Sequence, residues 1–250
     1  MQVDEGGMPG ESPPKGTRLP AVRGMVSVRD ESWIIEDTLD SWPCDEVYLY
    51  MDAPPEFHID HPKIKECVLS TLYDPDRQRA EWYKRQLLFN SLSRFCENND
   101  WICLFDADEH LDHFRPEILT DLSIACIHCI SWDFYITPED EDKPYQERDW
   151  VSPKFRRLPF FIRWDPRLTW HRPNQHNPDR DKTMGETVIH GSVKHWGPGY
   201  SVENYERKRD YYVREWPIYK ERWEGREAVK RDYKDDFGRP LIRYSEIEHV

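Results

Sequence analysis

The first half of the chain alternates between short runs of consecutive apolar residues and segments in which apolar residues recur at helical spacing. The runs are typical of buried strands and cover residues 25–28, 47–51, 67–69 and 101–105. Helical spacing marks residues 34–42, which Pro43 ends, and residues 80–96, which follow the helix-start signal Asp74-Pro75. With its short connections, this order predicts an α/β fold with a doubly wound sheet flanked by helices.

The second half has fewer and less regular apolar segments. We expect strands over residues 124–136 and 158–164, and a polar, proline-rich loop over residues 166–184. Beyond Gly199, five aromatic residues from Tyr205 to Trp223 recur at spacings of seven, four, three and four, which predicts helix with an interruption at Pro217. The expected parts are a flexible tail (1–20), one α/β domain (21–200) and a C-terminal helical extension (201–250).

Composition narrows the class of protein. The chain has 250 residues, of which 38% are hydrophobic and 14% aromatic, and this content argues against disorder. The net charge of −13 weighs against nucleic acid and anionic membranes as partners. We see neither a secretory signal nor an apolar run long enough for a transmembrane segment. We therefore expect a soluble, cytoplasmic protein, with at most a peripheral association with a membrane.

Six cysteines are spread through apolar segments: Cys44, Cys67, Cys96, Cys103, Cys126 and Cys129. We expect reduced core thiols, because a cytosolic protein seldom forms disulfides. Cys126 and Cys129 are the only close pair, and a zinc site would need a second pair.

The strongest chemical signal is Asp106-Ala107-Asp108-Glu109, directly after an apolar strand. Carboxylates at alternate positions past a strand can converge on Mg²⁺ or Mn²⁺, and a diphosphate can fill the ion's remaining positions. The alternative is a strand followed by an acidic helix N-terminus, with His110 and His113 on the solvent face of that helix. His195 is the second candidate, as a ligand for Mn²⁺, with His190 and His171 as competitors.

Other polar residues suit a nucleotide. Asp52 ends its strand as Asp106 does, where a base or ribose would bind, although an Asp before two prolines also starts turns. Arg77, Arg79, Lys84 and Arg85 make a basic helix start, which suits a diphosphate or is simply a solvated face. Gly-rich phosphate loops are missing, which counts against a Walker-type ATPase and a dinucleotide dehydrogenase.

Three stretches resemble family-two glycosyltransferases with the GT-A fold. Val26-Ser27-Val28-Arg29-Asp30-Glu31, followed by residues 47–52, is similar to their opening. Arg85-Gln86 followed by residues 100–109 looks like their helix and Asp-x-Asp strand. Lys194-His195-Trp196-Gly197, with the Arg-Lys-Arg within residues 203–211, is similar to a late His motif in one bacterial and viral branch.

The resemblance implies a GT-A-like mixed sheet, a nucleotide-sugar donor and Mn²⁺ or Mg²⁺. By position, Asp108 would bind the metal and His195 would be a further ligand. Asp106 would support the metal or contact the ribose, and Arg85 would approach the donor. Asp30, Glu31 and Asp52 would line the nucleoside pocket.

Inversion of the sugar also requires a base that takes the proton of the acceptor hydroxyl. Related sequences often have a His-Glu pair after the late strand, where this chain has Trp170-His171-Arg172. Asp165, Asp133 and His171 are the candidates, and Asp165 is favoured.

We therefore expect a metal-dependent, inverting glycosyltransferase of the hexosyl or deoxyhexosyl type, whose acceptor is a glycan or another hydroxyl compound. The alternative is a metal-dependent hydrolase of the phosphoesterase type that uses the same Asp and His cluster. A third reading makes the aromatic C-terminal helices a docking element on a binding module.

Overall fold

The computed structural model describes residues 19–29, 31, 33–52, 58–70, 77–170, 185–215 and 220–249. Its helices and main strands are, in chain order, β1 (Val22–Val28), α1 (Ile35–Ser41), β2 (Glu46–Met51), β3 (Ile64–Leu69), α2 (Arg77–Ser93), β4 (Trp101–Leu104), β5 (Glu109–Asp112), β6 (Ile124–Asp133), β7 (Trp150–Val151), β8 (Arg156–Arg163), β9 (Glu186–His195), α3 (Val202–Glu215), α4 (Lys220–Trp223) and β10 (Ile242–Arg243). The strands and helices expected up to residue 105 are confirmed, and the fold is mixed α/β.

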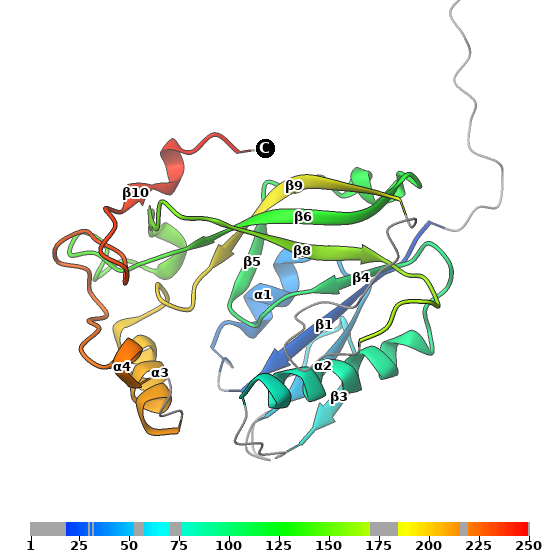
Figure 1. Ribbon diagram of the computed structural model, residues 1–250, viewed down its shortest axis with the longest axis horizontal. Coiled ribbons are helices and arrows are strands. Elements are labelled where there is room, and N and C mark those ends of the chain that lie inside the picture. The colour runs from blue at the N-terminus through cyan, green and yellow to red at the C-terminus, as the bar shows by residue number, and fades with distance from the viewer. Residues whose placement is uncertain are drawn as a thin grey trace, which may run out of the picture.

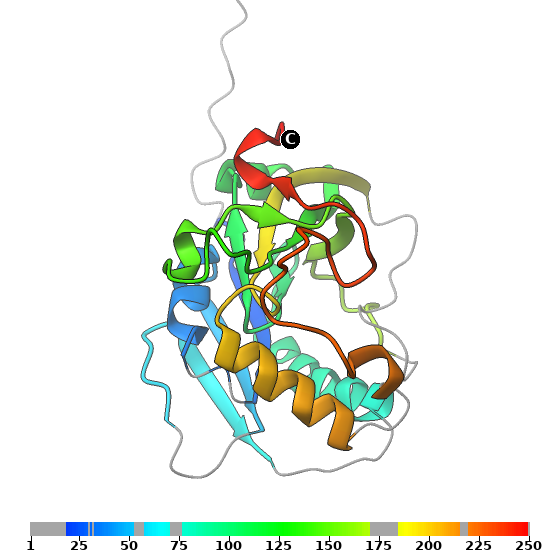
Figure 2. The same ribbon diagram turned by 90° about the vertical axis from the view of Figure 1, so that its left-hand side faces the viewer.

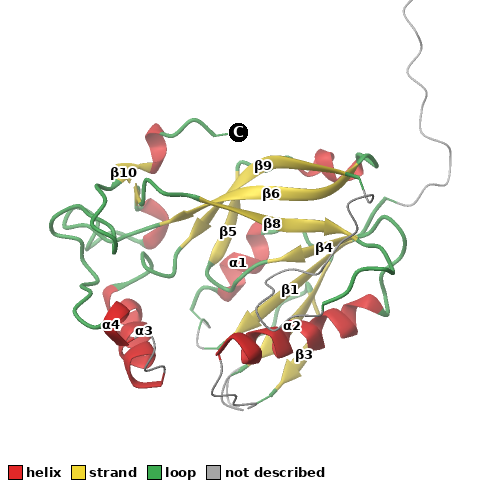
Figure 3. Cartoon of the chain, viewed as in Figure 1, coloured by secondary structure: helices red, strands yellow, loops and turns green. Residues whose placement is uncertain are grey.

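One sheet of eight strands organises the molecule, in the order β3-β2-β1-β4-β8-β6-β9-β5 (Figures 1 and 3). Strands β1 to β4 run parallel, and β8 pairs antiparallel with both β4 and β6. Strand β9 is parallel to β6, and β5 returns antiparallel along β9. Six strands therefore end at one edge of the sheet, and β5 and β8 begin there.

Alternating side chains of the parallel strands build two hydrophobic layers, one on each face. Val26 and Leu49 pack with Leu39 of α1, whereas Met25 and Tyr48 pack with α2. Successive side chains of a strand point to opposite faces, so the unbroken apolar runs in the sequence reflect strands that are covered on both sides. Figure 1 shows α1 and α2 on opposite sides of β1.

The C-terminal segment is helical only in its first part. Helix α3 is described up to Glu215 and α4 from Lys220, and the interruption expected at Pro217 lies outside the described residues. Residues 224–249 then return to the sheet as turns and the short strand β10, which pairs with β7. Tyr244 packs with Trp132 and Trp196, so this return is anchored in the core. Figure 1 shows α3 and α4 beside the edge at which β1, β6 and β9 end, and Figure 2 looks onto that edge.

The segment after the acidic motif is a strand, and the alternative of a helix carrying His110 and His113 is wrong. Residues 109–112 pair with residues 192–195 of β9, and this pairing overrides any local helical preference. His110 contacts the rings of Tyr145 and Trp196, and burial lowers its pKa to about 4. His113 is exposed, with the positive φ of 51° that ends the strand.

The cysteine side chains and the helices can be compared with the expectations of free thiols and of no membrane-spanning helix. Four cysteines are buried (Cys44, Cys103, Cys126 and Cys129), Cys96 is half-buried and Cys67 is exposed. All six are free thiols, as expected. Among the described helices, none combines the length and the apolar character that crossing a bilayer would require.

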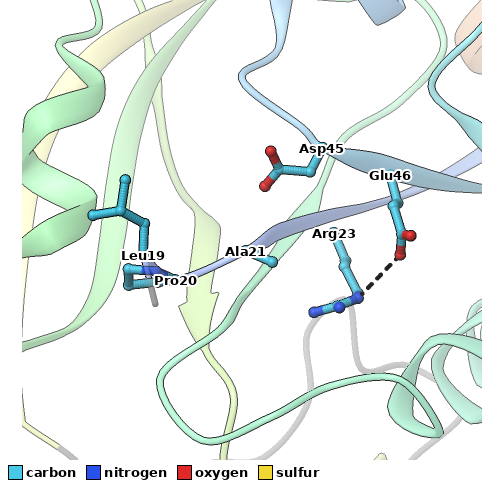
Figure 4. A pocket seen from close by; sticks show the side chains of 6 residues that line it. All are labelled: Leu19, Pro20, Ala21, Arg23, Asp45 and Glu46. Carbon is cyan, nitrogen blue, oxygen red and sulfur yellow. Dashed lines mark hydrogen bonds and ion pairs between the residues drawn. The ribbon is translucent and has the colours of Figure 1, made fainter. Parts of the chain in front are cut away.

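A small pocket of about 290 Å³ lies at the start of β1, at the edge of the sheet opposite to the acidic motif (Figure 4). The charged residues of this pocket form hydrogen bonds that hold the strands together. Arg23 bonds to Glu46 and to the buried Asp100, and Asp45 accepts the backbone N–H of Val22 at 2.7 Å. Asp100 also accepts the N–H groups of Ala21 and Glu97, both at 2.9 Å. This carboxylate therefore fastens the beginning of β1 to the beginning of β4.

Removal of this carboxylate should destabilise the sheet without any effect on the opposite edge. We expect Asp100→Ala to lower the free energy of unfolding by about 3 kcal/mol, because the buried Arg23 loses its buried carboxylate partner and keeps only Glu46, and two N–H groups lose their acceptor. Urea unfolding measures the loss. Asp142→Ala, at an exposed position, is the control and should change stability by less than about 0.5 kcal/mol. Equal stabilities of the two variants would contradict the assignment.

Candidate functional site

The directions of the strands bring together residues that are far apart in the sequence. The acidic motif connects β4 to β5, Asp133 ends β6 and His195 ends β9, all at the same edge. In register, His195 lies opposite both Asp133 and Glu109. The candidate site is therefore placed by hydrogen-bonded strand pairs rather than by flexible loops.

His195 is held between two carboxylates. Its Nδ1 donates to Asp133 Oδ1 at 2.6 Å, and its Nε2 faces Asp108 Oδ1 at 3.5 Å. Asp133 is fixed in turn by Arg156, at 2.8 Å. Burial opposes protonation of His195, but the charge of Asp108 and the hydrogen bond to Asp133 outweigh it and raise its pKa. The contact with Asp133 fixes the ring and directs Nε2 toward Asp108.

Asp108 is buried and has a second cationic neighbour, Lys208 of α3. Lys208 Nζ donates to Asp108 Oδ2 at 3.1 Å. Burial favours the neutral acid, but Lys208 and His195 outweigh it and hold the pKa of Asp108 below its usual range. Asp108 is therefore a fixed negative charge with one oxygen toward His195 and the other toward Lys208.

Gly197 leaves room where these three side chains meet. A Cβ atom at this position would lie 2.7 Å from Asp108 Oδ2, 2.9 Å from His195 Nε2 and 3.1 Å from Lys208 Nζ. A methyl group would displace all three ends, so the convergence depends on the absence of a side chain here.

The other two acidic residues of the motif point in different directions. The side chain of Asp106 is 58% exposed and lies 3.5 Å from Arg85 NH2. Glu109 is buried, and its Oε2 accepts the backbone N–H of Asp106 at 2.8 Å. Burial and the charge of Asp106 raise the pKa of Glu109. Glu109 thus shapes the turn, while Asp106 faces the solvent side of the pocket.

These residues line a pocket of about 1530 Å³ between the strand edge, α2 and the C-terminal segment. Its volume exceeds the roughly 300–1,000 Å³ of most small-molecule pockets, so two substrates have room. Among the described residues, eleven Lys and Arg and ten Asp and Glu line it, in a chain with a net charge of −13. The pocket is therefore far less acidic than the chain as a whole, which suits an anionic ligand.

The residues expected at a nucleoside lie at one end of this pocket. Asp52 accepts from Lys84 Nζ at 2.8 Å and lies 3.9 Å from Arg29 Nε. Glu31 accepts the backbone N–H of Arg29 at 2.8 Å. The guanidinium of Arg29 hydrogen-bonds to the hydroxyl of Tyr211 in α3, over whose ring it lies. Asp52, Glu31 and Arg85 are thus brought to the same pocket as Asp108 and His195.

Three expected residues are not brought to this site by the described structure. Asp30 and His171 lie outside the described residues. Asp165 follows β8, which ends beside the start of β4 at the opposite edge of the sheet. Its carboxylate binds Arg167 at 2.7 and 2.8 Å, and these hydrogen bonds lower its pKa to about 2. Asp165 is thus a weak base at the edge of the sheet opposite to the acidic motif. The preference for Asp165 as the base that takes the acceptor proton is therefore corrected.

Lys208 and Gly197 are the functional candidates that the sequence did not single out. Lys208 belongs to the run Arg207-Lys208-Arg209, which reads as a basic stripe on a surface helix. A signal was nevertheless present, because Lys208 is three residues after the buried Tyr205 and hence on the same face of the helix. Gly197 was visible only as part of a turn.

Asp108 Oδ1 and His195 Nε2 fit one divalent cation. Metal–ligand distances of about 2.0–2.2 Å allow two atoms 3.5 Å apart to bind the same ion. Asp133 supplies the carboxylate that orients such a histidine. Within the described ranges, no three His, Cys, Asp or Glu side chains form a metal-binding group. The protein would thus supply two ligands and leave the others to a bound substrate.

No protein-family model matches the chain, and no curated protein matches its sequence.

Gly197→Ala tests whether the convergence on Gly197 forms a binding site. We expect its affinity for Mn²⁺ with inorganic pyrophosphate to fall at least tenfold, about 1.4 kcal/mol, because the new methyl group separates Asp108, His195 and Lys208. Its melting temperature should change little, since only side-chain ends must move. Calorimetric titration and thermal unfolding measure the two quantities.

Gly191→Ala is the matched control, on strand β9, which ends two residues before Gly197. Gly191 has a φ of +81° and lies outside the pocket, with its Cβ position 3.0 Å from Phe114. This variant should lose stability through backbone strain and keep its binding. The same binding loss in both variants would show that the effect of Gly197→Ala is not local.

Proposed function

We propose that the chain is a metal-dependent glycosyltransferase that moves a sugar from a nucleotide-diphosphate sugar to an acceptor hydroxyl, with inversion, on a GT-A-like domain. The observation that carries the proposal is the pair Asp108 and His195, 3.5 Å apart at the strand edge and oriented by Asp133. The resemblance of residues 100–109 to the Asp-x-Asp strand of family-two glycosyltransferases supports it.

The donor would lie along the strand edge. Asp108 and His195 hold Mn²⁺ or Mg²⁺, which when bound stabilises the negative charge of the departing diphosphate as a Lewis acid. Arg85 lies beside Asp106 and Lys208 beside Asp108, and both offer cationic hydrogen-bond donors to phosphate oxygens. Asp106, exposed beside Arg85, is placed to contact the ribose or the metal's other ligands.

The nucleoside would occupy the end of the pocket formed by Asp52, Glu31 and Arg29, with Asp30 as a further expected contact. The base and ribose present N–H and O–H groups, which carboxylates accept. The ion pairs of Asp52 with Lys84 and Arg29 hold its carboxylate in place before a ligand arrives.

The acceptor proton would pass to a base at the other side of the sugar. Asp133 lines the pocket, but Arg156 and His195 hold its pKa low, so we assign it to the orientation of His195. Of the three residues expected for this role, His171 then remains the proposed base.

The cluster supports a hydrolase less well. A two-metal phosphoesterase requires two ions with ligands from several strand ends. Within the described residues, Asp108 and His195 make a site for one ion. A docking module would not need a buried carboxylate between an imidazole and an ammonium.

Thermal unfolding with UDP, GDP, TDP and CMP, each with and without Mn²⁺, tests the proposal. We expect one nucleotide to stabilise the protein in the presence of Mn²⁺, by about 2.7 kcal/mol at a hundredfold excess over Kd. Asp108→Asn should abolish the shift, because the metal ligand loses its charge.

Asp112→Asn is the matched control, since Asp112 pairs with Lys194 at 2.9 Å outside the pocket. It should keep the full nucleotide shift. A shift with Mn²⁺ alone and none with any nucleotide would contradict the transferase and favour the hydrolase.

A further inference from the structure

The C-terminal helix α3 places an ammonium group on the carboxylate that is the candidate metal ligand. Lys208 Nζ donates to Asp108 Oδ2 at 3.1 Å, while Asp108 Oδ1 faces His195 Nε2. The side chain of Asp108 is 6% exposed and that of Lys208 is 33% exposed. The carboxylate is therefore buried, whereas a third of the lysine side chain is exposed in the lining of the pocket.

The space around these groups is small. A single Cβ at Gly197 would contact Asp108, His195 and Lys208 at once, at 2.7 to 3.1 Å. A divalent cation on Asp108 and His195 and the ammonium of Lys208 would therefore be close neighbours of like charge, which repel. The single negative charge of Asp108 cannot compensate both the two positive charges of the cation and the one positive charge of the Lys208 ammonium.

We propose that Lys208 is an exchangeable internal counter-ion of Asp108: its ammonium compensates Asp108 when the site is empty and transfers to the donor diphosphate when cation and donor bind together. This inference rests on the proposed function. The four-carbon stem of lysine and the rotation of its ammonium allow the transfer over a short distance. Glu31 lines the same pocket and its charge favours the protonated form of Lys208, so the ammonium keeps a negative neighbour.

The exchange has a consequence for the order and strength of binding. A cation that arrives alone at Asp108 Oδ1 is repelled by the ammonium of Lys208, which already pairs with Oδ2, and therefore binds weakly. A diphosphate supplies the negative charge that retains both the cation and the ammonium. Lys208 thus makes the binding of cation and diphosphate cooperative, so that the metal is held when the donor is present.

Lys208→Met distinguishes this role from that of an ordinary structural ion pair. In the full-length protein, we expect Mn²⁺ alone to bind about five- to tenfold more tightly to the variant, because its competitor is gone. With Mn²⁺ saturating, inorganic pyrophosphate should bind at least tenfold more weakly. Isothermal titration calorimetry measures both affinities, and thermal unfolding confirms that the variant is folded.

Two further variants serve as controls. Lys208→Arg retains the positive charge, so its affinity for Mn²⁺ alone should remain that of the wild type. Lys194→Met removes a Lys–Asp pair of similar length, 2.9 Å to Asp112, on the strand that carries His195 but outside the pocket. It should leave both affinities unchanged.

The exchange predicts that Lys208→Met binds Mn²⁺ alone more tightly and pyrophosphate more weakly, and these opposite changes are its test. Weaker binding of both Mn²⁺ and pyrophosphate to Lys208→Met, or an unchanged affinity for Mn²⁺ alone, would overturn the exchange while the proposed function stands. Failure of the wild type to bind pyrophosphate with Mn²⁺ would overturn the proposed function, and the exchange with it.

Discussion

The pairing of β6 with β9 is the constraint on which the candidate site depends. These two parallel strands end together, which places Asp133 beside His195 and lets the 2.6 Å hydrogen bond between them form. Strand β5 runs back along β9, so Glu109 and the turn before it are held against the same histidine. A shift of one residue in either register would turn His195 to the other face of the sheet.

The charges of neighbouring side chains also stabilise this arrangement. Two carboxylates alternate with an imidazole and an ammonium along the chain of contacts Asp133, His195, Asp108 and Lys208. Each carboxylate is partly or fully buried, and each has a basic side chain as its neighbour, which makes its burial tolerable. Such an arrangement keeps Asp108 ionised and its position fixed before any ligand enters.

The sequence predicted the first half of the fold well, because continuous apolar runs and helical spacing are local patterns. It also identified Asp108 and His195 as partners, through the motifs that carry the resemblance. It failed where pairing between distant segments decides the structure. The segment with His110 is a strand only because β9 lies beside it, and Asp165 is at the wrong edge only because β8 runs antiparallel. Lys208 reaches Asp108 across 100 residues, a contact that no local pattern encodes.

The C-terminal helix closes the pocket by contacts to both of its ends. Tyr211 hydrogen-bonds to Arg29, and Lys208 bonds to Asp108, so α3 joins the loop after β1 to the turn after β4. During synthesis the chain emerges from its N-terminus, and all eight strands of the main sheet are complete by His195. The main sheet of the nascent protein could thus fold first, before α3 covers the ends of its strands. The pairing of Asp108 with an ammonium group is possible only after Lys208, which follows the last strand of the main sheet, has been added.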